Sequence, residues 1–114
     1  GVGTRSPLIA DVLRDRNALY RMAADGVENG YTLKLVNKTD EAREYRVSLQ
    51  SANADIALDG GARTVRADAA QVLSLPLVAT APATLEGRHE VVFVIESADG
   101  KTRETVDSSF FGPM

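Results

Sequence analysis

The chain of 114 residues contains no cysteine and only one histidine, His89. The missing thiols exclude disulfides, zinc–thiolate centres, iron–sulfur ligation and cysteine nucleophiles within this chain. Tryptophan is also absent and aromatic residues make up 5% of the chain, which leaves few rings for the stacking platform of a sugar-binding surface. The composition therefore argues against most classes of reactive centre and predicts a chain that is not itself an enzyme.

Neither sign of charge dominates, because 13 Lys and Arg stand against 16 Asp and Glu, a formal net charge of −3. A nucleic-acid-binding domain needs a basic face, so we expect no nucleic-acid partner. The longest apolar run, residues 91–95, is far shorter than the roughly 20 residues of a membrane helix. The hydrophobic fraction of 44% still suffices for a packed core. We expect a single domain over residues 7–114, preceded by a tag remnant or linker at 1–6.

Alternation of apolar and polar residues is the main pattern in the chain. It runs through YTLKLVNKT, residues 31–39, and returns in REYRVSLQ, residues 43–50. A period of two predicts strands with one buried face. The short polar connection between the two segments predicts that they pair as a hairpin.

The later segments add further strands. In VLSLPLVAT, residues 72–80, Pro76 cannot donate to a ladder, which predicts an edge strand or an unpaired position. EVVFVIES, residues 90–97, is apolar on both faces and predicts a central strand, or one whose outer residues Val92 and Val94 meet a partner, such as a second copy in a weak dimer. The turn ADGK then leads into a last strand. About seven strands at this spacing predict an all-β, antiparallel β-sandwich.

The segment LIADVLRDRNALYRM, residues 8–22, fits two structures. Apolar residues four apart fit a helix, whereas alternation at its start fits a strand, and periodicity does not decide between them. If the segment forms strands, residues 15–17 make a turn between two short edge strands. The following stretch ADGVENG, residues 24–30, predicts another turn because its Asp-Gly and Asn-Gly pairs tolerate positive φ.

Four segments in order carry a family resemblance: DVLRDRNALYR (residues 11–21), YTLKLVNKT, VLSLPL and the closing SSFFGP. The first is the most specific. Together they resemble the C-terminal domain of the FixG/CcoG proteins, over residues 7–113. The resemblance implies an immunoglobulin-like β-sandwich, which favours strands over a helix for residues 8–22.

The resemblance also implies a parent protein, a membrane-bound ferredoxin-type protein that assists assembly of cbb-type cytochrome c oxidase and handles copper. Its 4Fe-4S clusters are expected in the parent outside this fragment, because no cysteine is present here. The domain is expected on the periplasmic side of the bacterial inner membrane. Its expected role is non-catalytic, with the membrane domain of the parent and oxidase subunits or assembly factors as partners.

Two alternatives to this role remain open from the residues. One is a weak copper-binding domain that uses His89 with its neighbours Glu86 and Glu90, or the methionines Met22 and Met114. The other is a generic surface-binding sandwich. We expect no catalytic, cofactor-binding or metal residues in this chain.

The turn Arg14, Asp15, Arg16 and Asn17 is the candidate interaction site. Two guanidinium groups on a tight turn can present planar donors to a carboxylate or a haem propionate. The alternative is that Arg and Asp pair internally and hold the turn. Phe111 is a second candidate, because its ring faces outward if Phe110 faces the core, and an exposed ring can mark a contact.

Overall fold

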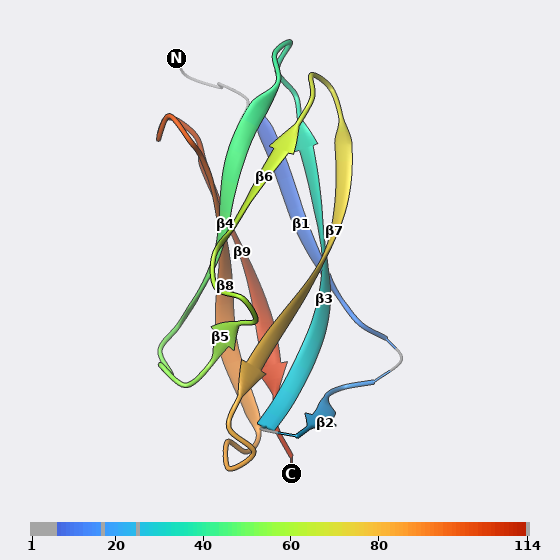
Figure 1. Ribbon diagram of the computed structural model, residues 1–114, viewed down its shortest axis with the longest axis vertical. Coiled ribbons are helices and arrows are strands. Elements are labelled where there is room, and N and C mark those ends of the chain that lie inside the picture. Colours follow the sequence, from blue (N-terminus) through green and yellow to red (C-terminus); the bar gives the residue numbers. More distant parts are fainter. Residues whose placement is uncertain (1–6, 17, 25, 114) are drawn as a thin grey trace.

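The computed structural model describes residues 7–16, 18–24 and 26–113, which fold into an elongated body of 46 × 25 × 22 Å (Figure 1). None of these residues is helical, so the described part includes no helix that could cross a membrane. The strands are β1 (Leu8–Arg14), β2 (Arg21–Ala23), β3 (Gly26–Asn37), β4 (Arg43–Ser51), β5 (Ala57–Leu58), β6 (Arg63–Ala67), β7 (Val72–Ala81), β8 (Arg88–Ser97) and β9 (Arg103–Phe111).

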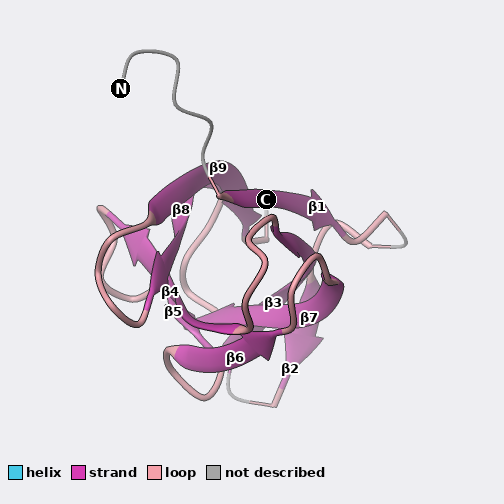
Figure 2. Cartoon of the chain, turned by 90° about the horizontal axis from the view of Figure 1, so that it is seen from above, coloured by secondary structure: helices cyan, strands magenta, loops and turns pink. Residues whose placement is uncertain are grey.

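The strands form two antiparallel sheets around a common interior (Figure 2). Sheet A has the order β1-β3-β7-β5, with β2 paired to the start of β3, and sheet B has the order β6-β4-β8-β9. The predicted all-β antiparallel sandwich is confirmed. The described residues contain nine strands instead of about seven, because the very short β2 and β5 escape a pattern that needs several alternating residues.

The core is built from the alternating residues of both sheets. Tyr31, Leu33 and Leu35 of β3 point inward, and so do Tyr45 and Val47 of β4. Between the sheets, the rings of Tyr31 and Phe93 meet edge to face, with centroids 4.9 Å apart. Period-two burial on each strand is what two stacked sheets require.

The predicted hairpin between residues 31–39 and 43–50 is wrong. The two strands are buried as expected, but β3 belongs to sheet A and β4 to sheet B. The connection between them crosses from one sheet to the other, and the buried amide of Asn37 braces it by donating to the carbonyls of Glu41, Ala67 and Asp68. Alternation fixes which face of a strand is buried but does not identify the neighbouring strand.

The predicted turn over residues 24–30 is also wrong beyond its first residues, because β3 already begins at Gly26. Gly26 serves close packing instead of a positive φ: a Cβ there would collide with the carbonyl oxygen of Ala81. The choice of strands for residues 8–22 is confirmed by β1 and β2, although β2 is shorter than expected and Asn17 lies outside the described residues.

Two other strand predictions are confirmed. β8 lies between β4 and β9, and a tight turn joins it to β9. At Pro76 strand β7 is unpaired on one side, because β5 pairs only with Ala79 and Thr80. The free carbonyl oxygen of Pro76 instead accepts a hydrogen bond of 3.1 Å from Arg63 Nη1 of β6.

Candidate interaction site

Two of the candidate site residues, Arg14 and Phe111, meet although they come from opposite ends of the chain. Arg14 ends β1 in sheet A, and Phe111 ends β9 in sheet B. The guanidinium carbon of Arg14 lies 4.4 Å from the centroid of the Phe111 ring and 6.0 Å from that of Tyr31. This geometry is a cation–π contact between the two sheets.

Asn29 joins these residues into one cluster. It is 1% exposed, and its Oδ1 accepts hydrogen bonds from Phe111 N at 2.8 Å and from Arg14 Nη2 at 3.0 Å. Its Nδ2 donates to the carbonyl oxygen of Phe111 at 2.9 Å. One side-chain amide thus satisfies both backbone groups of Phe111 at the edge of sheet B, where β9 pairs with no described strand other than β8. We call Arg14, Asn29, Tyr31 and Phe111 the closing cluster.

Arg14 is held internally on several sides. Besides Asn29, its Nη2 donates to the carbonyl oxygen of Leu19 at 2.7 Å, which ties down the connection between β1 and β2. Its Nε is buried and has no hydrogen-bond partner among the described residues. The planar group therefore serves the fold first, and its use toward an external carboxylate or propionate stays a prediction.

The remaining candidates lie on the turn after β1. Asp15 N donates to the carbonyl oxygen of Gly30 at 3.0 Å, and its carboxylate packs above Gly30. The side chains of Asp15 and Arg16 are exposed, and Arg16 forms no hydrogen bond or ion pair with the part of the chain that is described. Asn17 lies outside the described residues, so only Asp15 and Arg16 present an outward face here.

Burial of Tyr31 in the closing cluster perturbs its ionisation. The residue is 3% exposed, and its hydroxyl donates to the carbonyl oxygen of Ser109 at 2.8 Å. Desolvation raises the pKa of Tyr31 from 10.0 to about 12, against a smaller lowering effect of the Arg14 guanidinium. The folded state therefore retains a proton that the unfolded state loses above pH 10.

We expect the free energy of unfolding to fall as the pH rises from 10 to 12. The stabilisation by the protonated Tyr31 is complete below pH 10. Above pH 10 it falls by up to about 1.4 kcal/mol per pH unit, which amounts to roughly 2–3 kcal/mol by pH 12. Urea unfolding at several pH values would measure it. Tyr31→Phe cannot ionise and is the control; parallel losses in both proteins over this range would show that another group is responsible.

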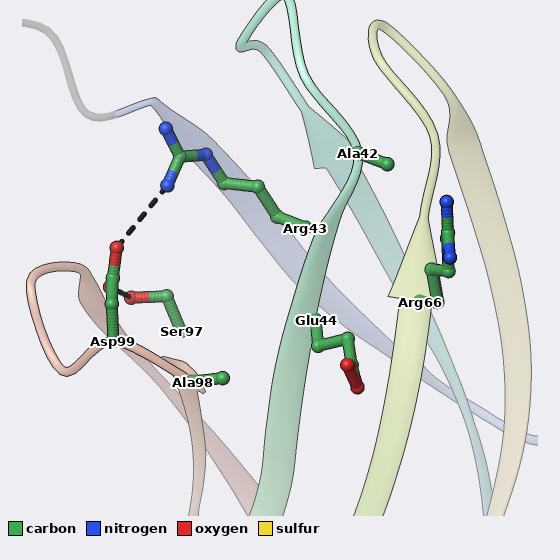
Figure 3. A pocket seen from close by; sticks show the side chains of 7 residues that line it. All are labelled: Ala42, Arg43, Glu44, Arg66, Ser97, Ala98 and Asp99. Carbon is green, nitrogen blue, oxygen red and sulfur yellow. Dashed lines mark hydrogen bonds and ion pairs between the residues drawn. The ribbon is translucent and has the colours of Figure 1, made fainter.

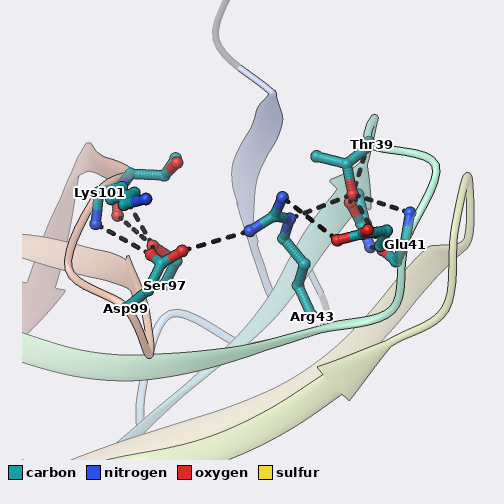
Figure 4. A network of polar contacts seen from close by, with 8 residues as sticks. Thr39, Glu41, Arg43, Ser97, Asp99 and Lys101 are labelled. Carbon is teal, nitrogen blue, oxygen red and sulfur yellow. Dashed lines mark hydrogen bonds and ion pairs between the residues drawn. The ribbon is translucent and has the colours of Figure 1, made fainter.

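A second polar cluster lies at the opposite end of the sandwich, around a shallow cavity of about 290 Å³ (Figure 3). Arg43 Nη1 lies 3.3 Å from Asp99 Oδ2, and its other nitrogens face Thr39 and Glu41 (Figure 4). The Ser97 hydroxyl donates a hydrogen bond of 2.6 Å to Asp99, and this bond is the main reason why the pKa of Asp99 is lowered. A hydrogen bond from the backbone N–H of Lys101 lowers it further. The cluster pins the β8–β9 turn to the β3–β4 connection.

This second cluster offers no obvious ligand site. Arg43 and Arg66 line the cavity together with Glu44 and Asp99, so both signs of charge are present. Arg43 is paired with Asp99, and Arg66 Nε lies 3.8 Å from Asp68 Oδ1. Such exposed pairs each contribute little to stability, and a lining that carries both signs of charge does not favour an ion of one sign.

The candidate copper ligands do not come together in the structure. His89 lies at the start of β8, with its Nε2 2.8 Å from the carbonyl oxygen of Glu86. Met22 is 58% exposed on β2 of the other sheet, and Met114 lies outside the described residues. Among the residues that the structure describes, no group of three or more His, Asp or Glu side chains is arranged for a metal ion. Copper binding stays an untested prediction.

Asn29 is the member of the closing cluster that sequence reasoning missed. The Asn-Gly pair predicts a turn there. The signal that could have found it is the alternation of β3, which continues backward from Tyr31 through Asn29 to Val27, all three of them buried. An Asn on the buried face of a strand predicts an internal hydrogen-bonding role.

Comparison with known proteins identifies the family. Residues 1–113 match the family described as "IG-like fold at C-terminal of FixG, putative oxidoreductase". The crystal structure of a FixG-related protein from Vibrio parahaemolyticus has a TM-score of 0.84 and 32% identity, over 96% of this chain and 100% of that chain. Native alpha-2-macroglobulin from Escherichia coli, with a TM-score of 0.56 and 21% identity over 91% of this chain and 15% of that one, shares the fold alone.

A longer relative also matches. Protein RdxB of Cereibacter sphaeroides is 46% identical over 55 residues, which are 47% of this chain and 11% of RdxB. The matched segment thus spans about a tenth of that protein's length. The expected immunoglobulin-like fold and the resemblance read from the sequence are both confirmed, and the chain belongs to the family of immunoglobulin-like domains at the C-terminus of FixG.

Proposed function

We propose that this chain is a non-catalytic interaction domain of a membrane-bound ferredoxin-type protein that assists cbb-type cytochrome c oxidase assembly and copper handling. The observation that carries the proposal is the family match over residues 1–113 to a domain at the C-terminus of FixG. In this proposal the parent's 4Fe-4S clusters lie outside this fragment, and the domain stands on the periplasmic side of the inner membrane.

The construction of the domain supports a scaffold role. Its buried polar side chains serve the fold: Asn29 binds the backbone of β9, and Asn37 braces the crossing between the sheets. The Arg14 guanidinium is used in the same way. Outward-facing groups such as Arg16 are then available for contacts with the membrane domain of the parent, an oxidase subunit or an assembly factor.

Deleting residues 7–114 from the full-length parent tests the proposal. We expect assembled, active oxidase in the membranes to fall several-fold, while the parent protein stays in the membrane and keeps its iron–sulfur absorption. The second property shows that the rest of the protein remains intact, because its clusters do not depend on this chain. Normal oxidase levels after the deletion would refute the role.

A matched pair of substitutions examines the candidate contact. Arg16→Ala and Arg66→Ala each remove one exposed arginine, from the β1–β2 turn and from β6 respectively. If the turn contacts a partner, oxidase assembly falls with Arg16→Ala and is unchanged with Arg66→Ala. Equal behaviour of the two variants would remove the turn from the proposed interface.

A further inference from the structure

Exposed apolar side chains are concentrated on one sheet. The large hydrophobic residues that are most exposed in the described part all belong to sheet A or its β1–β2 connection: Ile9 (48% exposed), Leu13 (44%), Leu19 (41%), Met22 (58%) and Val72 (63%). The outer face of sheet B differs, because Val94 is only 5% exposed and Val92 is partly buried. Of these residues, Ile9, Leu13 and Val72 lie on the outer face of sheet A, which is therefore the more apolar of the two outer faces.

Two of these side chains, Ile9 and Val72, stand in register across sheet A on either side of the partly buried Val36. Ile9 of β1 pairs with Val36 of β3, and Val36 pairs with Val72 of β7. We call Ile9, Val36 and Val72 the apolar row. Paired residues of adjacent strands point to the same face, and strands lie about 4.8 Å apart, so the row is about 10 Å wide.

A second pair of apolar residues lies further along the same face. Leu13 and Pro76 flank Thr32 four residues further along the strands, roughly 13 Å away. Between the apolar row and this second pair lies a polar row with Lys34 at its centre. An apolar face interrupted by one polar row is typical of a contact that also forms a few polar interactions.

The apolar row lies where the chain enters the sandwich. The carbonyl oxygen of Pro7 accepts a hydrogen bond of 2.9 Å from Lys38 N, and Leu8 pairs with Asn37. The backbone is thus fixed up to Pro7, beside Ile9. The family places this domain at the C-terminus of FixG, and the segment matched in RdxB is only 11% of that protein. The preceding polypeptide of such a parent reaches the domain at this end.

The size of the patch favours an occupant that is covalently tethered. A patch of about 10 by 13 Å is far below the roughly 800 Å² per partner that a stable complex of free proteins buries. A partner joined through the chain at Pro7 is instead present at millimolar effective concentration, so a small contact suffices. A second copy of the domain has no such advantage.

We propose that the outer face of sheet A, centred on the apolar row, docks against the preceding part of the same polypeptide. This inference rests on the proposed function in that it requires a longer parent protein. Docking through Ile9, Val36 and Val72 holds sheet A against the parent and leaves the outer face of sheet B free for other partners.

A photo-crosslinking amino acid at position 72 of the full-length parent, in its native membranes, tests the docking. Position 105 is the matched control, because Thr105 is also exposed but lies on the outer face of sheet B. We expect irradiation to give an intramolecular crosslink from position 72, mapped by mass spectrometry to sequence before this domain, at several times the yield from position 105.

Each other result would overturn the docking. A product of doubled mass would assign the face to a second copy, a lipid adduct alone would assign it to the membrane surface, and equal yields at the two positions would show no docking. The deletion experiment above is independent of these outcomes. A crosslink from position 72 together with normal oxidase assembly after the deletion would support the docking and refute the assembly role. No crosslink together with impaired assembly would refute the docking and support the assembly role.

Discussion

Replacing Phe93 with alanine is expected to lower the free energy of unfolding by about 3–5 kcal/mol. Phe93 is fully buried on β8, the strand that lies between β4 and β9 in sheet B. Its ring meets the edge of the Tyr31 ring from sheet A, so alanine would leave a cavity at the point where the two sheets touch. The aromatic contact itself contributes about 0.5–1.5 kcal/mol of this loss.

Urea unfolding followed by circular dichroism would measure the loss. Small domains are stable by only about 5–15 kcal/mol, so Phe93→Ala could leave the domain unfolded, and Phe93→Leu, with a smaller cavity, is the second variant. Val92→Ala on the same strand is the control, because its side chain faces outward. A Phe93→Leu variant as stable as Val92→Ala would contradict the central position assigned to the ring.

Replacing Asn29 with alanine is expected to lower the free energy of unfolding by about 3 kcal/mol. The substitution removes the hydrogen-bond partner of three polar groups at once. Phe111 would lose a partner for both its N–H and its carbonyl, and Arg14 would lose an acceptor. A buried polar group without a partner costs about 1–3 kcal/mol, and more if it is charged. Because these bonds fasten the end of β9 to sheet A, amide hydrogen exchange at Phe111 should also become faster.

Asn53→Ala is the matched control for this prediction. The side chain of Asn53 accepts one hydrogen bond, from the N–H of Asp55 in an exposed loop, so its loss should cost well under 1 kcal/mol. Unchanged exchange at Phe111 in the Asn29 variant, with stability equal to that of the Asn53 variant, would show that Asn29 does not close the sandwich.

Much of the fold could be predicted from local pattern alone. Alternation located β3, β4 and β7, and a run apolar on both faces placed β8 at the centre of a sheet. These features follow from a strand's own burial. The partner of each strand does not, which is why β3 and β4 were paired wrongly: a short polar connection fits a hairpin and a crossing between sheets equally well.

In the candidate site, too, local sequence predicts individual residues but not which of them come into contact. Arg14 and Phe111 were each identified from local sequence, but their contact depends on β1 and β9 closing the sandwich side by side. The turn signal at Asn29-Gly30 concealed the residue that joins them. Residue type suggested a positive φ, whereas the long strand β3 runs straight through both positions.

The placement of the two terminal strands has a mechanical consequence. β1 begins at one end of the long axis and β9 finishes at the other, beside the closing cluster (Figure 1). A force pulling on both ends of the chain would therefore act along the strands and load many ladder bonds in shear at the same time, instead of unzipping them one by one. Tension transmitted through such a domain would meet high resistance before the first strand detached.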